Sequence, residues 1–385
     1  MPSTPLSPSE RIDAIDVLRG VALFGVLAIN IVTEFRVSIF EQFMPTARTA
    51  SPLDHAVEVF LLLAIELKAL ALFSFLFGVG LAIQFERLAG DARRVTLLVR
   101  RLTVLLAIGL GHLFLIWNGD ILTEYALAGF IALPFLLGPR WLLAAGALLF
   151  LALYLIMPLL PQVVSWPTAT WMADHIAEAR NVYGAGNFWD VLAFRIREVP
   201  SIFPLHVFVF PRTVALFLFG ALAWRTGILH PSAAYGRLPS ILAVVGVLVG
   251  GGLTVAVEGA ALGPFEGGRL PVERLAAVVL ASGYGAAVIG LMRLWPGFLL
   301  WAAPLGRMAF TNYLAQSVIF GWIFYGYGLG LFGRLGASAA LAIGIGVYVA
   351  QVMVSAWWLR HYRFGPVEWV WRTLMYGQRQ NMRAH

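Results

Sequence analysis

The sequence has no cysteine and few charged residues. Without cysteine the chain forms no disulfide and performs no thiolate chemistry, so its redox compartment cannot be read from cysteine usage. Only 12% of the 385 residues are charged, whereas soluble domains carry about 25%. Lysine is almost missing as well, because Lys68 is the only lysine among 27 basic residues. A larger core does not account for so large a deficit, and the composition therefore excludes an ordinary soluble protein.

Several chemistries leave no trace in the sequence. There is no Walker loop, no glycine-rich dinucleotide fingerprint after a strand, no HExxH motif and no GxSxG elbow. The 7 histidines are scattered, so we expect no metal site. The net charge of +7 does not predict a nucleic-acid partner, because the arginines gather in short loops on one side of the apolar runs. This distribution follows the positive-inside rule of membrane proteins.

Hydrophobic residues make up 60% of the chain, and the mean hydropathy is +0.82. Apolar runs of about 17 residues or more recur along the whole length, as bilayer spans require. We therefore predict an all-α, polytopic integral membrane protein, with residues 1–385 forming one membrane domain. The arginine bias places both termini in the cytoplasm. About ten spans are predicted, over residues 14–33, 57–85, 102–117, 121–137, 141–157, 203–224, 240–257, 272–292, 308–328 and 337–359.

Two segments outside these spans have a pattern of their own. Residues 158–200 form an external loop too long for a hairpin turn, which predicts a lid, a short surface helix or a plain connector. Residues 366–376 begin with Pro366, a favoured first helical residue, and contain tryptophans, which predicts an interfacial helix. A weak echo also links residues 72–78 with residues 216–220, although such residues are common in any membrane helix.

Charged side chains inside the apolar runs are the most informative residues, since each costs about 2.5 kcal/mol or more at bilayer depth. Asp16 and Arg19 lie three residues apart and can pair on the cytoplasmic side, or they can anchor an anionic ligand there. Glu66 and Lys68 are two residues apart and point to different faces of a helix. They fit either a functional cavity or an interhelical salt bridge.

A tight hairpin between two predicted spans contains a second polar group. Asn118 and Gly119 form a strong turn signal, and Asp120 follows at the start of the next helix. The helix dipole alone explains Asp120 and Glu124. However, His112 lies at a depth where it can face Asp120 across the turn, and such a pair orients an imidazole for proton transfer.

Four further polar residues lie in or beside later spans, and they serve either as substrate contacts or as links between helices. Amide side chains four residues apart often hold membrane helices together, which is the simpler interpretation for the two amides. The four residues are Arg212, Arg307, Asn312 and Gln316.

The motifs together resemble the YeiB-like family of bacterial membrane proteins, which is defined by a domain of unknown function (418). The resemblance implies a multi-pass protein of the bacterial inner (cytoplasmic) membrane. The resemblance rests on residues 15–20 (IDVLRG), 76–80 (LFGVG), 101–103 (RLT), 111–112 (GH) and 119–122 (GDIL). Its strongest matches are residues 306–314 (GRMAFTNYL) and 365–372 (GPVEWVWR). The order is that of the family, and the matches run from residue 12 to about residue 377.

The family in turn looks like a distant relative of the transmembrane acyltransferases. Those enzymes move an acyl group from a cytoplasmic thioester to an acceptor across the membrane, often a sugar. In the branch that acetylates lysosomal glucosamine, a catalytic asparagine stands where this chain has Asn30. That branch also has a catalytic histidine shortly afterwards, whereas this chain has Glu41 near that place and no histidine before His55. The resemblance therefore implies His112 or Glu41 as the base.

These observations lead to one function with two rivals. We expect an acyltransferase-like protein that uses acyl-CoA as donor and a small molecule or glycan as acceptor at the outer face. The rivals are a small-molecule or lipid transporter, with the buried charges as its path, and a non-catalytic membrane partner. Membrane lipids are expected partners, nucleic acid is not, and a homo-oligomer stays open. The candidate residues are Asn30, His112, Asp120 and Glu41 for catalysis; Asp16, Arg19, Glu66, Lys68, Glu124, Arg212, Arg307, Asn312 and Gln316 for substrate binding; and Arg100 and Arg101 for the donor.

Overall fold

The computed structural model describes residues 13–44, 51–160, 165–229, 238–258, 266–295 and 297–383. Within these ranges the chain is helical, and the one β-type pairing is an isolated bridge between Tyr362 and Arg383. The predicted all-α fold class is confirmed. In chain order the elements are α1 (Asp13–Asn30), η2 (Ile31–Phe35), η3 (Ile39–Phe43), α2 (Pro52–Ala64), α3 (Lys68–Arg87), α4 (Arg94–Gly111), η4 (His112–Ile116), α5 (Leu122–Leu137), α6 (Arg140–Ile156), η5 (Met157–Leu159), α7 (Ala169–Ala185), α8 (Phe188–Arg225), α9 (Leu238–Glu258), α10 (Glu266–Leu294), η6 (Leu300–Ala302), α11 (Ala303–Arg307), α12 (Ala309–Phe324), α13 (Ala337–His361) and α14 (Pro366–Tyr376).

Every predicted span falls on helix. Within the described residues, 7 helical stretches are long and apolar enough to cross a membrane, and α5 and α6 are shorter apolar helices. Large apolar side chains also cover the outside of the bundle; Leu248 on α9, for example, is 69% exposed. Helices that are apolar on their outer face are stable only in lipid, because water would not solvate that surface. The chain is a polytopic membrane protein, as predicted.

The predicted span 308–328 is too long, because α12 ends at Phe324, and this helix is not among the apolar helices counted above. Two other spans also differ from their prediction. The run 57–85 is not one helix, since α2 ends at Ala64, α3 begins at Lys68, and Leu67 between them has a left-handed backbone with φ of 60°. The other difference is α8, which is 38 residues long and begins inside the segment predicted as an external loop. An Asn187 capping box starts it there, so residues 158–200 contain α7 and the first part of α8.

The echo between residues 72–78 and 216–220 has a structural counterpart. Gly78 on α3 lies against the backbone of Phe217, and Gly220 on α8 lies against the backbone of Phe75, so a Cβ at either glycine would overlap a carbonyl. The rings of Phe77 and Phe217 stack with centroids 4.8 Å apart. Small residues of this kind allow membrane helices to approach closely. The two echoing segments therefore pack α3 against α8.

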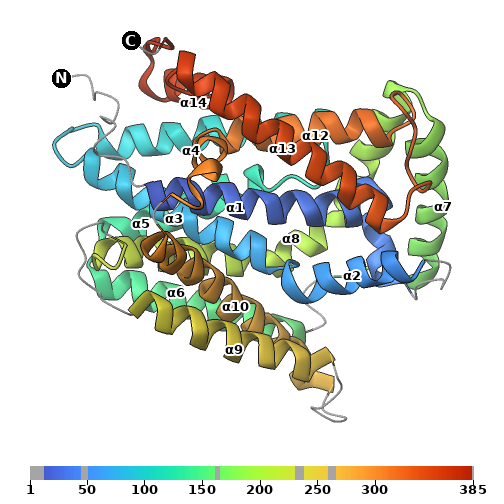
Figure 1. The fold of residues 1–385 in the computed structure, drawn as a ribbon, viewed down its shortest axis with the longest axis horizontal. Coiled ribbons are helices and arrows are strands. Elements are labelled where there is room, and N and C mark those ends of the chain that lie inside the picture. Colours follow the sequence, from blue (N-terminus) through green and yellow to red (C-terminus); the bar gives the residue numbers. More distant parts are fainter. Residues whose placement is uncertain are drawn as a thin grey trace.

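The two ends of the bundle carry different elements (Figure 1). Helix α7 runs across one end, whereas α14 lies at the opposite end, near the start of α1. Helices α9 and α10 pack against each other along one side, and α10 also contacts α3. The predicted helix at residues 366–376 is present with the same bounds. Its placement in the interface and the cytoplasmic location of that end stay predictions.

The two motifs with the strongest family resemblance contact each other. The carboxylate of Glu368 on α14 accepts hydrogen bonds from the backbone N–H groups of Phe310 and Thr311, at 2.8 and 3.0 Å, and from the Thr311 hydroxyl. It thus caps the free amides at the start of α12. Burial raises the pKa of Glu368 above its ordinary value, and the bonds from Thr311 oppose that rise.

Candidate functional site

A buried chain of three polar side chains joins the α4–α5 hairpin to α12. His112 Nδ1 lies 2.7 Å from Asp120 Oδ1, and His112 Nε2 lies 2.9 Å from the hydroxyl oxygen of Ser317. No more than 2% of any of the three residues is exposed. The contact between His112 and Asp120 is the one expected across the hairpin. Ser317 is an addition that the sequence did not reveal.

The sequence left open whether Asp120 starts a helix or pairs with His112, and in the structure it does both. Its carboxylate accepts the N–H groups of Leu122 at 3.1 Å and Thr123 at 2.7 Å, so it caps α5. The same carboxylate faces His112. With the imidazole proton on Nδ1, facing Asp120, Nε2 can accept the proton of the Ser317 hydroxyl, which also lies 3.4 Å from the carbonyl oxygen of Tyr313. Carboxylate, imidazole and hydroxyl in this order form the arrangement that activates an oxygen nucleophile.

Both π-helical segments of the described chain lie at this level of the bundle. One is η4, which begins with His112, and the other is η2, which begins directly after Asn30. The rings of Phe35 in η2 and Trp117 after η4 stack with centroids 4.4 Å apart, so the two segments touch. A π turn places one extra residue in a helix and re-aims its side chains, and such turns are frequent at functional sites.

Two carboxylates line a small cavity beside this group. Glu34 of η2 and Glu198 of α8 face a space of about 10 Å³ that Trp117, Asn118 and Tyr325 also line. That volume is close to the minimum that one water molecule needs. The carboxylate of Glu34 lies directly against Gly119, where a Cβ would overlap it. The Glu34 carboxylate can therefore occupy this place because residue 119, in the turn, is a glycine.

Glu198 is fixed by three partners. It binds His175 Nε2 at 2.7 Å, the Tyr183 hydroxyl at 2.6 Å and the Asn118 amide. His175 and Tyr183 belong to α7, so the segment predicted as a lid, surface helix or connector is a helix that supplies polar groups to this end of the bundle. The lid role itself stays a prediction.

Glu124 and Arg212 lie further along the same face of the bundle. Glu124 contacts His206 Nδ1 at 3.1 Å and accepts the hydroxyl of Thr213, both from α8. Arg212 is 2% exposed, yet its Nε and Nη1 have no hydrogen-bond partner among the described residues. Its guanidinium carbon lies 5.9 Å from the ring centre of Tyr154. Glu124 and Arg212 are thus buried, as expected of substrate contacts, but neither hydrogen-bonds to His112.

Glu66 and Lys68 flank the break between α2 and α3. The ammonium of Lys68 donates to the backbone carbonyl of Leu62 at 2.9 Å, an acceptor that the end of α2 leaves open. Lys68 is 5% exposed. At the break, the side chain of Lys68 therefore points back towards the end of α2. A discontinuous membrane helix with ionisable residues at the break is also typical of secondary transporters.

The predicted donor side carries several arginines. Arg19 pairs with Asp16 at 3.2 Å. Arg101 donates to Gln84 at 2.5 Å, and its guanidinium lies 4.0 Å from the ring centre of Trp371 on α14. Arg100 is exposed beside Gly377 at the end of α14. The structure therefore gathers Arg19, Arg100 and Arg101 at one end of the bundle, although Arg101 also serves to hold α14.

The remaining candidates form no hydrogen bond with His112. Asn312 and Gln316 bind Ser355 and Gln351 of α13 at 2.9 and 2.8 Å, which links two helices, and Arg307 ends the short α11. Asn30 is buried at the end of α1, but it is not a hydrogen-bond partner of His112. Glu41 forms a surface ion pair with Arg180 at 3.2 Å.

Sequence reasoning missed Ser317, Glu34, Glu198 and His175. Ser317 is one residue after Gln316, but a serine in a membrane helix usually bonds to its own backbone and gives no signal. Glu34 and Glu198 lie in segments predicted as loops, where a carboxylate gives no signal of a functional site. His175 lies in the segment 158–200, for which a surface helix was one of the predicted alternatives, but the sequence does not indicate which face of such a helix is buried.

A helical bundle with an apolar exterior, polar residues inside and a buried histidine group defines the class of the protein as a polytopic α-helical membrane protein. The sequence pattern of the family described as "Protein of unknown function (DUF418)" matches residues 223–378. The chain is 34% identical to the uncharacterized protein YxaH of Bacillus subtilis (strain 168), over 97% of this chain and 96% of YxaH. It is 31% identical to the uncharacterized protein YeiB of Escherichia coli (strain K12), over 95% of this chain and 96% of YeiB. The chain belongs to this DUF418 family.

Proposed function

We propose that this protein is a membrane-embedded acyltransferase that moves an acyl group from a thioester such as acyl-CoA to a hydroxyl or amine. The observation that carries the proposal is the hydrogen-bonded chain Asp120–His112–Ser317. It supplies a base, a group that orients the base, and a hydroxyl within reach of it. The acceptor is a small molecule or a glycan.

The reaction has two balanced steps. In the first, the Ser317 oxygen attacks the thioester carbonyl while His112 Nε2 takes the hydroxyl proton; the C–S bond breaks, and the thiolate receives that proton. In the second, an acceptor hydroxyl or amine gives its proton to His112 and attacks the serine ester; the bond between the acyl carbon and the Ser317 oxygen breaks, and that oxygen takes the proton from His112. Asn30 is the proposed donor to the carbonyl oxygen. All three residues are buried, so the substrates reach them only when the neighbouring helices separate.

The proposed donor site lies at the arginine end of α4. Arg101 and His112 are 11 residues apart on one helix, which corresponds to about 16 Å at the helical rise. A donor whose phosphates bind Arg100 and Arg101 must therefore extend a thioester arm by about that length. This requirement favours an extended thioester over a compact acyl phosphate.

The absence of cysteine gives a direct test. A thiol-reactive dye mixed with the purified protein and acetyl-CoA reports only released CoA, because the protein has no thiol of its own. We expect thiol release that increases with amino sugars as acceptors and falls at least about 100-fold in His112→Gln and Ser317→Ala. The matched control is His361→Gln, because His361 is exposed at the end of α13. Equal rates in His112→Gln and wild type contradict the proposal.

The break between α2 and α3 favours a second candidate, transport. Its left-handed Leu67 and the buried Lys68 resemble the interrupted helices that form substrate sites in transporters. The same preparation in liposomes distinguishes the two functions. Solute uptake that depends on a pH gradient and is lost in Lys68→Met, with no thiol release, supports transport.

A further inference from the structure

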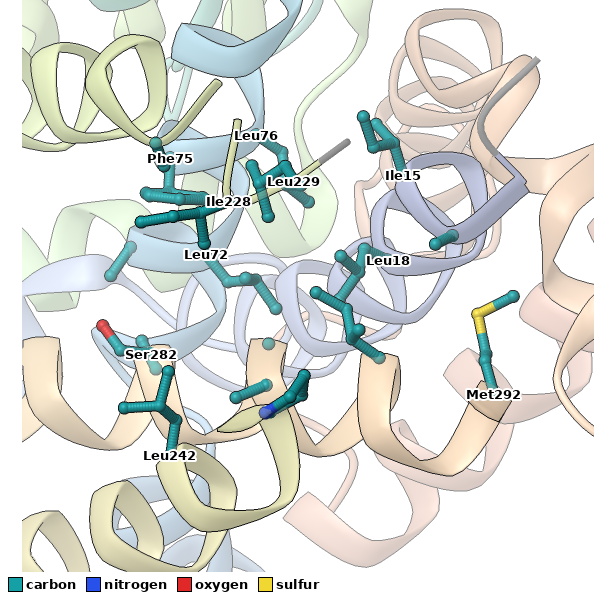
Figure 2. Close-up of a pocket in the computed structure, with 18 of the residues that line it drawn as sticks. Ile15, Leu18, Leu72, Phe75, Leu76, Ile228, Leu229, Leu242, Ser282 and Met292 are labelled. Carbon is teal, nitrogen blue, oxygen red and sulfur yellow. The ribbon is translucent and has the colours of Figure 1, made fainter. Parts of the chain in front are cut away.

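A large cavity lies on the side of the bundle, and His112 is not among its lining residues. It has a volume of about 500 Å³ and is bounded by α1, α3, the end of α8, α9 and α10. Figure 2 shows side chains of these elements around one open space, with Leu18 on α1, Leu72 on α3, Leu242 on α9 and Met292 on α10. Neither His112 nor any residue of the Glu34 cavity lines it. It is therefore a separate site.

The lining is apolar apart from one serine and two charged residues. Ser282 is the uncharged polar residue of the lining, and its hydroxyl is bonded to the carbonyl of Val278 at 2.9 Å. The charged residues are Asp13, at the start of α1, and Arg293, in the last turn of α10. A dry apolar cavity much smaller than this one already binds hydrocarbon. The occupant must therefore be a hydrocarbon with a charged group at one end.

The length of the cavity matches one leaflet of a bilayer. Its lining along α10 extends from Val278 to Arg293, which is 15 residues or about 22 Å. Half of a hydrocarbon core is about 15 Å, and a headgroup layer adds several more. The Arg293 end lies at the same end of the bundle as Asp13, where the predicted topology places the cytoplasm. The cavity thus has the dimensions of one acyl chain with its headgroup.

The charges at the mouth select the headgroup. Asp13 and Arg293 are both exposed, and neither forms an ion pair within the described part of the chain. A phosphate suits Arg293, and an ammonium group suits Asp13. We propose that this cavity binds an acyl chain of an inner-leaflet aminophospholipid, with the phosphate at Arg293 and the amine at Asp13. The lipid leaves hydrocarbon to enter hydrocarbon, so the selectivity arises from the headgroup and not from the hydrophobic effect.

The test is lipid retention in the purified full-length protein. The protein is reconstituted with equal amounts of phosphatidylethanolamine and phosphatidylglycerol, transferred to mild detergent and examined by native mass spectrometry. We expect one retained phosphatidylethanolamine per chain. Ser282→Trp, which places an indole ring in the cavity, should lower that occupancy about tenfold, whereas Leu275→Trp on the same helix, at an exposed residue outside the lining, should not.

Two substitutions at the residues proposed to bind the headgroup test the proposal without changing the packing of the cavity. Both residues are exposed, so their substitution leaves the fold intact. Asp13→Asn should shift the preference about threefold towards phosphatidylglycerol, and Arg293→Gln should weaken retention of both lipids. Unchanged retention in Ser282→Trp, or a wild type that retains phosphatidylglycerol or only detergent, overturns the proposal. None of these outcomes depends on acyl transfer.

Discussion

Substitutions at Asp120 can distinguish a structural role of the histidine group from a catalytic one. The Asp120 carboxylate both caps α5 and binds the imidazole of His112. Asp120→Ala removes the cap of α5, at about 1 kcal/mol. It also removes the hydrogen bond between a charged carboxylate and His112, at about 2 kcal/mol. The loss of stability is therefore about 3 kcal/mol in all.

Asp120→Asn acts differently. Asparagine caps a helix about as well as aspartate, so the free energy of unfolding should fall by less than about 1 kcal/mol. With its oxygen on the Thr123 amide, however, the new side chain places its NH₂ group where Oδ1 was, so that it faces His112 Nδ1 and gives up the bond from the Leu122 amide. That forces the imidazole proton onto Nε2, which can then no longer accept from Ser317. The acyl-transfer rate should fall about 10⁴-fold, the loss seen when a triad aspartate becomes asparagine.

The measurements are thermal unfolding in detergent, followed by tryptophan fluorescence, and thiol release from acetyl-CoA. Asp190→Asn is the matched control, because Asp190 completes an exposed capping box at the start of α8 and contacts no histidine. It should leave both quantities near wild type. An Asp120→Asn variant that keeps its rate within about tenfold, or loses as much stability as Asp120→Ala, refutes the reasoning.

Four further predictions follow from the same structure. Lys68→Met leaves the Leu62 carbonyl unpaired and should lower stability by about 1–3 kcal/mol in thermal unfolding; a wild-type melting curve contradicts the role of Lys68 at the break. Gly119→Ala should destabilise because its Cβ meets the Glu34 carboxylate, whereas Gly111→Ala, which faces open space, should not. Burial raises the pKa of Glu368 from 4.5, so folding takes up a proton and stability falls as pH rises through the raised value; Glu368→Gln should remove this dependence. A topology reporter after residue 95 or at the C-terminus should be cytoplasmic and one within residues 165–190 external; an external C-terminus contradicts the predicted orientation.

The sequence was sufficient for features that depend on local order along the chain. Apolar runs set the helices, and the turn at Asn118 and Gly119 fixed the depth of His112 relative to Asp120, which is why their contact could be predicted. Ser317 could not be, because it lies 205 residues from His112 and its position depends on how α12 is rotated about its axis. Depth follows from counting residues, whereas rotation about the axis follows only from packing.

The break between α2 and α3 was unpredictable for another reason. Residues 57–85 contain no proline, and the break occurs at Leu67, a residue that rarely has a positive φ. Lys68 gave the only signal, but its bond to the Leu62 carbonyl belongs to neither of the two interpretations that the sequence offered. The positions of Glu34 and Glu198 were also not predictable from the sequence. Glu198 is buried because α8 extends into a segment that was predicted as a loop.

The most direct test of the central claim is a cryo-EM structure with a thioether analogue of acetyl-CoA that cannot transfer its acyl group. The account predicts density for the phosphates at Arg100 and Arg101. It also predicts the reacting carbon within about 3.5 Å of the Ser317 oxygen, on the side that His112 Nε2 faces. Analogue density at the break between α2 and α3, or an analogue bound at the arginines with its reacting carbon far from Ser317, would contradict it.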